Sequence, residues 1–219
     1  MFSNCTSLTS LNLENFRTRS VRTMSHLFDN CYNLKYLNVA KFDTSQVLDM
    51  SYMFYNCSSL TSLDVSHFVT SVTSTMIKMF ENCKSLKELE FNENMDTDSL
   101  RSMSYMFSGC DSLEHLDLSK FNTRLVTDMS YLFNDCTNLK EINLNNINTD
   151  SVTNMKFMFA YCTNLKYLDL LSFNTEKCNN YDSMFEDYNS NLTLSLDREK
   201  CKNMLKNIPN EIKIKENLF

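Results

Sequence analysis

A repeat of 26 residues runs through this chain of 219 residues and constrains its fold more than any other feature. A phenylalanine recurs every 26 residues, with one step of 27, at Phe2, Phe28, Phe54, Phe80, Phe107, Phe133, Phe159 and Phe185. A cysteine follows each of the first seven by three residues, at Cys5, Cys31, Cys57, Cys83, Cys110, Cys136 and Cys162. A chain this regular is expected to form a stack of similar coils in which each coil contacts only its neighbours.

The two halves of each repeat have different hydrophobic periods. One half ends in alternating apolar residues, as at Leu37 and Val39, and this pattern predicts a short strand. The other half, as in residues 24–31, places apolar side chains at i, i+3, i+4 and i+7. That spacing is typical of one face of a helix, so we expect a helix of about two turns in each repeat.

Polar residues mark both ends of each predicted helix. The residues just before the apolar stripe can accept hydrogen bonds from a first helical turn: Thr23, Asp49, Thr75, Ser102, Asp128, Asn154 and Asn180. The residues before the repeated cysteine tolerate the left-handed conformation in which helices often end, with Tyr161 as the exception: Asn4, Asn30, Asn56, Asn82, Gly109, Asp135 and Asp187. With one Gly in the chain, Asn takes over the role that Gly has in most turns.

One strand and one short helix per 26 residues predict an α/β leucine-rich-repeat solenoid. Parallel strands would line its concave face and short helices its convex face. A plain parallel β-helix is the alternative, and the helical stripe argues against it. We expect residues 1–188 to form the solenoid, as seven full repeats and the start of an eighth without an N-terminal cap. Residues 189–219, where the pattern decays, are expected to form a C-terminal cap.

The composition excludes several classes of function. One Gly leaves no glycine-rich loop for a nucleotide phosphate, and His26, His67 and His115 form no metal-binding or triad spacing. A formal net charge of -6 argues against a nucleic-acid partner. No window is apolar enough to insert into a membrane. We therefore expect no enzymatic activity, no cofactor and no metal site.

Several strings resemble one known family. Residues 53–66 (MFYNCSSLTSLDVS) and residues 115–123 (HLDLSKFNT) are similar to the BspA-like leucine-rich-repeat surface proteins, and the similarity covers about residues 1–188. That family occurs on bacterial and some protist surfaces, and its members are implicated in adhesion and in binding host proteins. The resemblance implies a cell-surface or extracellular location and such a role here.

The cysteine column admits two interpretations. Parallel coils would bring the Cα atoms of neighbouring cysteines within disulfide range. However, their side chains would point in the same direction, and they share the apolar stripe with Phe and Met. We therefore predict reduced, buried thiols.

The outward positions of the predicted strands carry the candidate binding residues. Among 21 such positions in seven repeats there are seven acids and no Lys or Arg. The candidate binding residues on this face are Asp64, Glu88, Glu90, Asp117, Glu141, Asp169, Tyr36 and Tyr167. Stacked like charges destabilise a sheet, so one interpretation is a hydrated face in which Asn residues separate the acids. The other is an acidic surface that recognises a basic partner, with a calcium ladder as a minor alternative.

The convex side carries a second column, made mostly of aromatic residues at one position of the predicted helices: His26, Tyr52, Lys78, Tyr105, Tyr131 and Phe157. Packing between neighbouring coils is the favoured interpretation, and a partner interface is the other. The single step of 27 places one extra residue between Phe91 and Met95, and we expect Met95 to occupy the core position that Phe has in other repeats.

These observations lead to one functional hypothesis and one alternative. The first is a non-enzymatic protein-binding module, acting in cell-surface adhesion or host interaction through its concave strand face. Its partner would be a protein, with basic or host-matrix proteins as candidates. The alternative is an intracellular scaffold or secreted effector with the same solenoid. The sequence leaves the ligand and the oligomeric state open.

Overall fold

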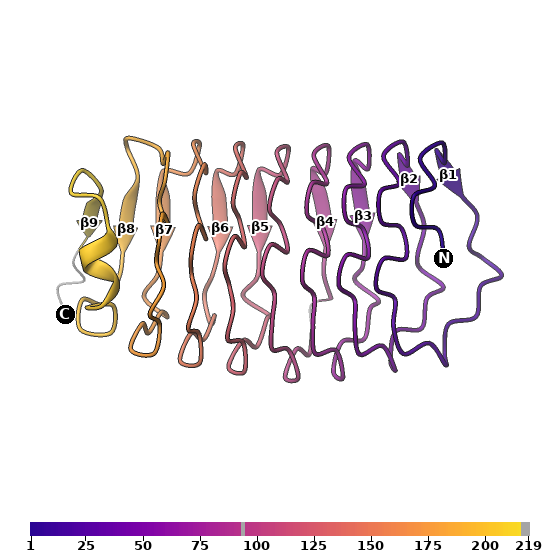
Figure 1. Ribbon diagram of the computed structural model, residues 1–219, viewed down its shortest axis with the longest axis horizontal. Coiled ribbons are helices and arrows are strands. Elements are labelled where there is room, and N and C mark those ends of the chain that lie inside the picture. Colours follow the sequence, from indigo (N-terminus) through magenta and orange to yellow (C-terminus); the bar gives the residue numbers. More distant parts are fainter. Residues whose placement is uncertain (93–94, 216–219) are drawn as a thin grey trace.

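The computed structural model describes residues 1–92 and 95–215, which form a row of coils stacked along one axis (Figure 1). Each coil contributes one short strand: β1 Ser10–Leu11, β2 Tyr36–Leu37, β3 Ser62–Asp64, β4 Glu88–Glu90, β5 His115–Asp117, β6 Glu141–Asn143, β7 Tyr167–Asp169 and β8 Thr193–Ser195. A 3₁₀ helix, η1 (Met204–Asn207), and a last strand, β9 (Lys213–Lys215), follow. The solenoid and its repeat length are confirmed.

The strands pair in parallel and in register, so that equivalent residues of consecutive coils lie side by side. Hydrogen-bonded ladders join β1 to β2, β3 to β4 and β5 to β6, and a three-stranded ladder contains β7, β8 and β9. Within the described part of the chain, no ladder joins β2 to β3, β4 to β5 or β6 to β7. The sheet is therefore divided into four parts along the stack.

The helices predicted for the second half of each repeat are wrong. In the coil that begins at Met24, two four-residue turns follow one another: Leu27 N–H donates to Met24 C=O (3.2 Å) and Cys31 N–H donates to Phe28 C=O (3.2 Å). Other N–H groups donate to the next coil, as from Phe28 to Met53 C=O at 2.9 Å. The first and last residues of two consecutive turns are spaced i, i+3, i+4 and i+7, so the turns reproduce the helical stripe without a helix. The helical stripe, which was the argument against a plain parallel β-helix, therefore no longer excludes that fold.

The polar residues predicted as helix N-caps have a related role. Asp49 Oδ1 accepts the N–H of Ser51 at 2.8 Å, and Asp128 Oδ1 accepts that of Ser130 at 2.9 Å. Each side chain closes a short turn ahead of the two four-residue turns. The same column forms single parallel bridges between coils, such as Asp49 to Thr75. These side chains are hydrogen-bond acceptors as predicted, but they accept within a short turn and not at the start of a helix.

The predicted left-handed column is confirmed. Asn30, Asn56 and Gly109 have φ values of 58°, 60° and 70°, and Tyr161, the exception in sequence, also lies there at 61°. The aromatic column on the same side is left-handed as well, which sequence analysis missed: His26, Tyr52, Lys78, Tyr105, Tyr131 and Phe157. Both columns occupy the third position of a four-residue turn, where a type II turn requires positive φ.

A continuous stack of phenylalanine rings fills the centre of the solenoid. The eight rings of the repeat column, from Phe2 to Phe185, stack with centroid separations from 5.4 Å to 5.9 Å. The nine cysteines are free, and all except the half-buried Cys5 are buried. Each repeat thiol from Cys31 to Cys162 donates to the carbonyl of a phenylalanine in the preceding coil, as from Cys57 to Phe28 at 3.2 Å.

A buried threonine column links the coils on the other side of the core. Thr123 Oγ1 donates to Asn148 C=O at 2.7 Å and accepts Asn148 N–H at 2.8 Å. Thr18 and Thr149 form the same pair of bonds with the next coil. One hydroxyl thus satisfies a backbone donor and a backbone acceptor of its neighbour.

The extra residue lies where the sheet is interrupted between β4 and β5. Met95 N–H donates to Asn92 C=O at 3.1 Å, matching the bond from Phe68 to Val65 in the preceding coil, and the Met95 side chain packs against the core. Met95 thus occupies the predicted position. Glu93 and Asn94, the other residues of the predicted bulge, lie outside the described residues.

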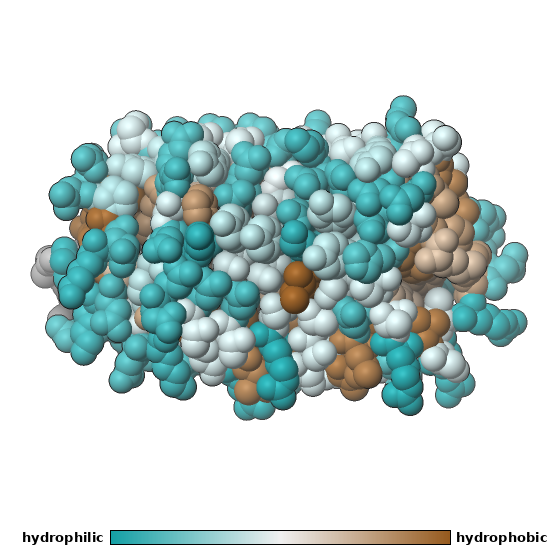
Figure 2. Space-filling model, viewed as in Figure 1, coloured by the Kyte–Doolittle hydropathy of each residue, from teal (hydrophilic) through white to brown (hydrophobic). Residues whose placement is uncertain are grey.

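The first coil is less well covered than the coils behind it. Phe2, Leu8, Leu11 and Phe16 are only partly buried. Figure 2 shows the resulting apolar surface at the N-terminal end of the stack. At the other end, β8, η1 and β9 cover the last coil with Leu196, Ile208 and Ile212 buried beneath them. The division into a solenoid and a cap at residue 188 stays a prediction.

Candidate functional site

The outward side chains of β1 to β9 form the strand face, which is the face expected to be concave. The candidate residues all lie on it. Tyr36 begins β2, Asp64 ends β3, and Glu88 and Glu90 flank the inward Leu89 of β4. The others follow the same alternation on β5, β6 and β7: Asp117, Glu141, Tyr167 and Asp169. Asp169 is half-buried, and the other seven candidates are exposed.

The middle column of this face has a structural role that sequence analysis missed. Asp64 Oδ1 accepts the N–H of Ser66 at 2.8 Å, and Asp117 Oδ1 accepts that of Ser119 at 2.8 Å. Asn12, Asn38, Asn143 and Asp169 make the same bond two residues ahead. Hydrogen bonds from the side chain and backbone of Ser66 lower the pKa of Asp64. The repeated Asx residues therefore close the turn after each strand, which explains the column without a ligand.

Glu90 is the exception in this column. Its strand, β4, pairs with β3 so that Asp64 lies beside Glu90 and Ser62 beside Glu88. Glu90 and Glu88 are both exposed, and Glu90 precedes the 27-residue step. The geometry gives these two carboxylates no role in closing a turn. They are the acids of the strand face that a partner could use without competing with the fold.

Other acids on or beside this face contact neighbouring side chains. His115 Nδ1 lies 3.2 Å from Glu141 Oε2 across β5 and β6, and Lys140 Nζ lies 2.6 Å from Glu114 Oε2 at the edge. Lys140 lowers the pKa of Glu114. Beyond the seven repeats, the exposed Lys213 and Lys215 of β9 extend the face with positive charge. The strand face is thus acidic over its middle and basic at its C-terminal end.

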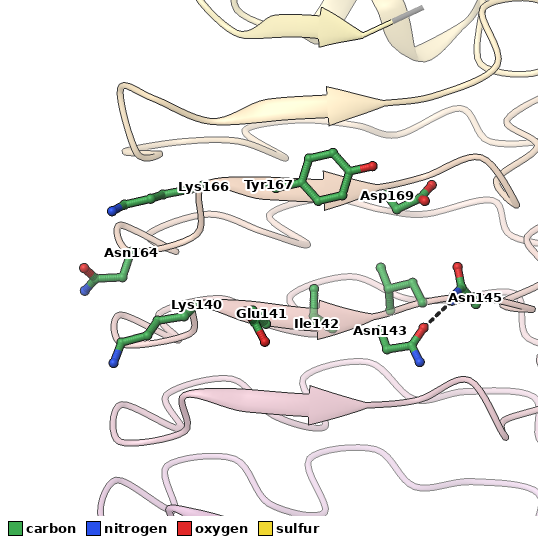
Figure 3. A pocket seen from close by; sticks show the side chains of 10 residues that line it. Lys140, Glu141, Ile142, Asn143, Asn145, Asn164, Lys166, Tyr167 and Asp169 are labelled. Atoms are coloured by element: carbon green, nitrogen blue, oxygen red, sulfur yellow. Dashed lines mark hydrogen bonds between the residues drawn. The ribbon is translucent and has the colours of Figure 1, made fainter. Parts of the chain in front are cut away.

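A shallow groove of about 650 Å³ opens where β6 and β7 are not joined by a ladder. Figure 3 shows the side chains that line it, with Lys140, Lys166 and Asn164 at one end and Asn143, Asn145 and Asp169 at the other. Tyr167, exposed to 45%, stands between them. The structure thus brings three candidates, Glu141, Tyr167 and Asp169, together at one place.

A second groove of about 560 Å³ extends over β1, β2 and β3 and includes the interruption of the sheet between β2 and β3. Tyr36, exposed to 68%, and Asp64 line it. The two candidate tyrosines therefore stand at different breaks in the sheet, which sequence analysis could not anticipate because every repeat has the same strand pattern.

The opposite side of each coil, built from the paired turns, carries the stacked aromatic column. Tyr105 and Tyr131 stack with centroids 4.3 Å apart, and Tyr131 and Phe157 with centroids 4.8 Å apart. Lys78 continues the column, with Nζ 4.5 Å from the centre of the Tyr105 ring. The pKa of Tyr105 is raised to about 12, mainly because the side chain is partly buried. The column packs coil against coil, which was the favoured interpretation.

Two features are absent from the described part of the chain: a cluster of metal-ligand side chains and a membrane-spanning helix. No group of three or more His, Cys, Asp and Glu side chains there could hold a metal ion. No helix within residues 1–92 and 95–215 has the length and apolar character needed to cross a membrane.

Comparison with known proteins identifies one family. The family model described as "Mycoplasma protein of unknown function, DUF285" matches residues 1–116 and again residues 101–218. No curated protein matches the chain.

The solved structures to which the chain is similar are distant in sequence. A leucine-rich repeat protein from Eubacterium ventriosum is 19% identical with a TM-score of 0.48 over 75% of this chain, and one from Bacteroides ovatus is 19% identical with 0.46 over 89%. An internalin from Listeria monocytogenes is 18% identical with 0.40 over 97%. The matched part makes up 39% of the length of the first of these proteins and 57% of the other two.

Proposed function

The chain belongs to the DUF285 family, Mycoplasma proteins of unknown function, and on that premise we propose that it is a non-enzymatic protein-binding module acting through its strand face. The observation that carries the proposal is the pair Glu88 and Glu90, exposed on β4 and held in no turn. With Asp64, Asp117 and Glu141 they form an acidic strip along the middle of the face. A partner with a basic surface would complement this strip.

The solenoid also suits such a role mechanically. Ladders and the phenylalanine stack hold the strands in fixed register, so side chains on the face are ordered before a partner arrives. A preorganised surface loses less conformational entropy on binding than a flexible one. Exposed tyrosines such as Tyr36 and Tyr167 are the residue type that contributes most often to binding energy.

We propose a cell-surface adhesion or host-interaction role, in line with the resemblance to BspA-like proteins. The alternative is an intracellular scaffold or secreted effector. Immunofluorescence of intact and permeabilised cells, with an antibody against the folded solenoid, separates these two locations. Staining of intact cells supports the first, and staining only after permeabilisation supports the second.

The binding proposal is tested by charge reversal on β4. Glu88→Lys with Glu90→Lys avoids the turn-closing acids, so the fold should keep its stability within about 1 kcal/mol. Binding to purified matrix proteins and to cytochrome c, a basic folded probe, is measured at two salt concentrations. We expect a loss of affinity of more than about tenfold and weaker wild-type binding at high salt.

A matched control changes charge at the rim of the same face. Lys35→Gln and Lys87→Gln alter exposed residues just before β2 and β4 and should change affinity by less than about threefold. Equal affinity of the wild type and the β4 variant for every probe, or binding indifferent to salt, would contradict the acidic-strip proposal.

A further inference from the structure

The groove between β6 and β7 carries opposite charges at its two ends. Lys140 and Lys166 precede the two strands, whereas Asp169 ends β7 and Asn143 ends β6. In Figure 3 both lysine side chains extend away from the strands at one end, and Asp169 lies at the other. Along the strand direction the groove therefore changes from cationic to anionic.

Only part of this charge is already used within the chain. Lys140 pairs with Glu114 at 2.6 Å, and Glu141 pairs with His115 at 3.2 Å. No ion pair among the described residues includes Lys166 or Asp169. One cation and one anion thus remain at opposite ends of the groove.

Apolar surface lies between these two charges. Ile142, the inward residue of β6, is only half-buried, unlike the fully buried Leu168 of β7. Lys215 Nζ lies 5.3 Å from the centre of the Tyr167 ring, so a cation–π contact holds the ring as one wall. The middle of the groove can therefore accept an apolar side chain.

We propose that this groove binds an extended segment of the partner protein that carries an acidic and a basic side chain four residues apart, with an apolar side chain midway. In an extended chain, residues i, i+2 and i+4 point to one side, and i to i+4 spans about 13 Å. The Cα atoms of Lys166 and Asp169 are about 10 Å apart at strand spacing, and the Lys166 side chain extends the span. The inference rests on the proposed function of the strand face.

The test uses a defined peptide: acetylated and amidated glutamate–threonine–valine–threonine–lysine. Titration into the isotope-labelled 219-residue protein is followed by NMR. We expect weak binding, with a Kd of about 1 mM, and shifted amide signals in residues 140–145 and 164–169. Replacing the peptide's glutamate or lysine by glutamine should each weaken binding by about threefold.

Paired changes in protein and peptide identify the contacts. In the Lys166→Met variant, replacing the peptide's glutamate by glutamine should no longer weaken binding. In the Asp169→Asn variant, whose amide oxygen still closes the turn, replacing the peptide's lysine by glutamine should no longer weaken binding. The matched controls are Lys87→Met and Asp117→Asn, at the same repeat positions on other coils. Both glutamine substitutions in the peptide should keep their full effect in these controls.

Three outcomes would overturn the proposal: no shifts at about 10 mM peptide, shifts confined to other coils, or equal coupling in the control variants. None of them bears on the charge-reversal test of the acidic strip, because that test changes Glu88 and Glu90 on β4, outside this groove, and leaves Glu141, which belongs to both surfaces, unchanged. Conversely, peptide binding in the groove with no effect of the β4 charge reversal would reject the acidic strip and retain the groove.

Discussion

The repeat thiols are weak acids in a dry environment. Cys83 Sγ donates to Phe54 C=O at 3.1 Å, and burial raises the pKa of Cys83 and Cys162 to about 12. The thiolate is the reactive form of cysteine, so these side chains are protected from oxidation while the protein is folded. The ladder of thiols thus belongs to the core and needs no redox role.

Alkaline pH should destabilise the protein through these thiols. Unfolded thiols lose their protons near their ordinary pKa of 9.0, whereas folded thiols such as Cys83 and Cys162 keep them up to a pKa of about 12. The unfolded state therefore gains stability as pH rises above about 9, and each such thiol contributes a loss of about 1 kcal/mol at pH 10. Urea unfolding at pH 7, 8, 9 and 10 measures this loss.

The Cys83→Ala variant separates the thiols from the tyrosines, which also titrate above pH 9. It should be less stable at pH 7 by about 1–2 kcal/mol because of the cavity, but its stability should fall less between pH 8 and pH 10. An unchanged dependence of stability on pH would contradict the assignment of this loss to the thiols.

The reduced state of the thiols is tested by counting reactive thiols after unfolding under non-reducing conditions. Fewer than about seven would reveal disulfides.

At the scale of elements, the sequence predicted the strands and their facing residues correctly, but the helices that it predicted are pairs of consecutive turns. The alternation at Leu37 and Val39 has one structural source, whereas the spacing of residues 24–31 has two, a helix or two consecutive turns. Both bury the same side chains, but in the turns the third residue is left-handed and several backbone N–H groups bond to the next coil. A single sequence does not record that choice.

The candidate site shows the same division. The position of Glu90 on an outward face followed from alternation along a strand. The turn-closing role of Asp117 could have been recognised, because Asx residues commonly accept a hydrogen bond two residues ahead. The grooves could not have been predicted from the sequence, because they depend on which neighbouring strands form ladders.

The threonine column gives a prediction at this scale. Thr123→Val keeps the shape of the buried side chain but leaves the N–H and C=O of the half-buried Asn148 without their partner, which should cost about 2 kcal/mol. The matched control is Thr127→Val, since the exposed Thr127 makes one long bond, 3.4 Å, to Arg101 C=O. Chemical denaturation measures both, and similar losses would contradict the bridging role of Thr123.

For the whole molecule, stability should vary along the stack. An inner coil, such as that from Phe54 to Met79, has a neighbour on both sides, whereas Phe2 and Leu8 in the first coil are half-covered. In solenoids each coil is stabilised by its own contacts and by its two interfaces. The first coil of this polypeptide should therefore open most easily.

Hydrogen exchange of the 219-residue polypeptide tests this gradient. The bonded amides of Phe2 and Asn4 should exchange at least about tenfold faster than the equivalent amides of Phe54 and Asn56. The comparison is internal, because both pairs donate to the next coil in the same way. Equal exchange would mean that the stack opens as one cooperative unit.

The bonds between the paired turns all run in one direction. In each such coil, as at Met24, His26, Phe28 and Asn30, four N–H groups point toward the C-terminal neighbour. Their peptide dipoles add along the stack, as they do along an α-helix, with the positive end at the C-terminus.

Some exposed side chains at the two ends complement this field. Arg17, Arg19 and Arg22 are exposed on the first coil, at the negative end, and Asp182, Glu186 and Asp187 are exposed on the last pair of turns, at the positive end. The side of the solenoid that is built from the paired turns is thus electrically polar along the stack, whereas Lys213 and Lys215 add positive charge to the strand face at the C-terminal end.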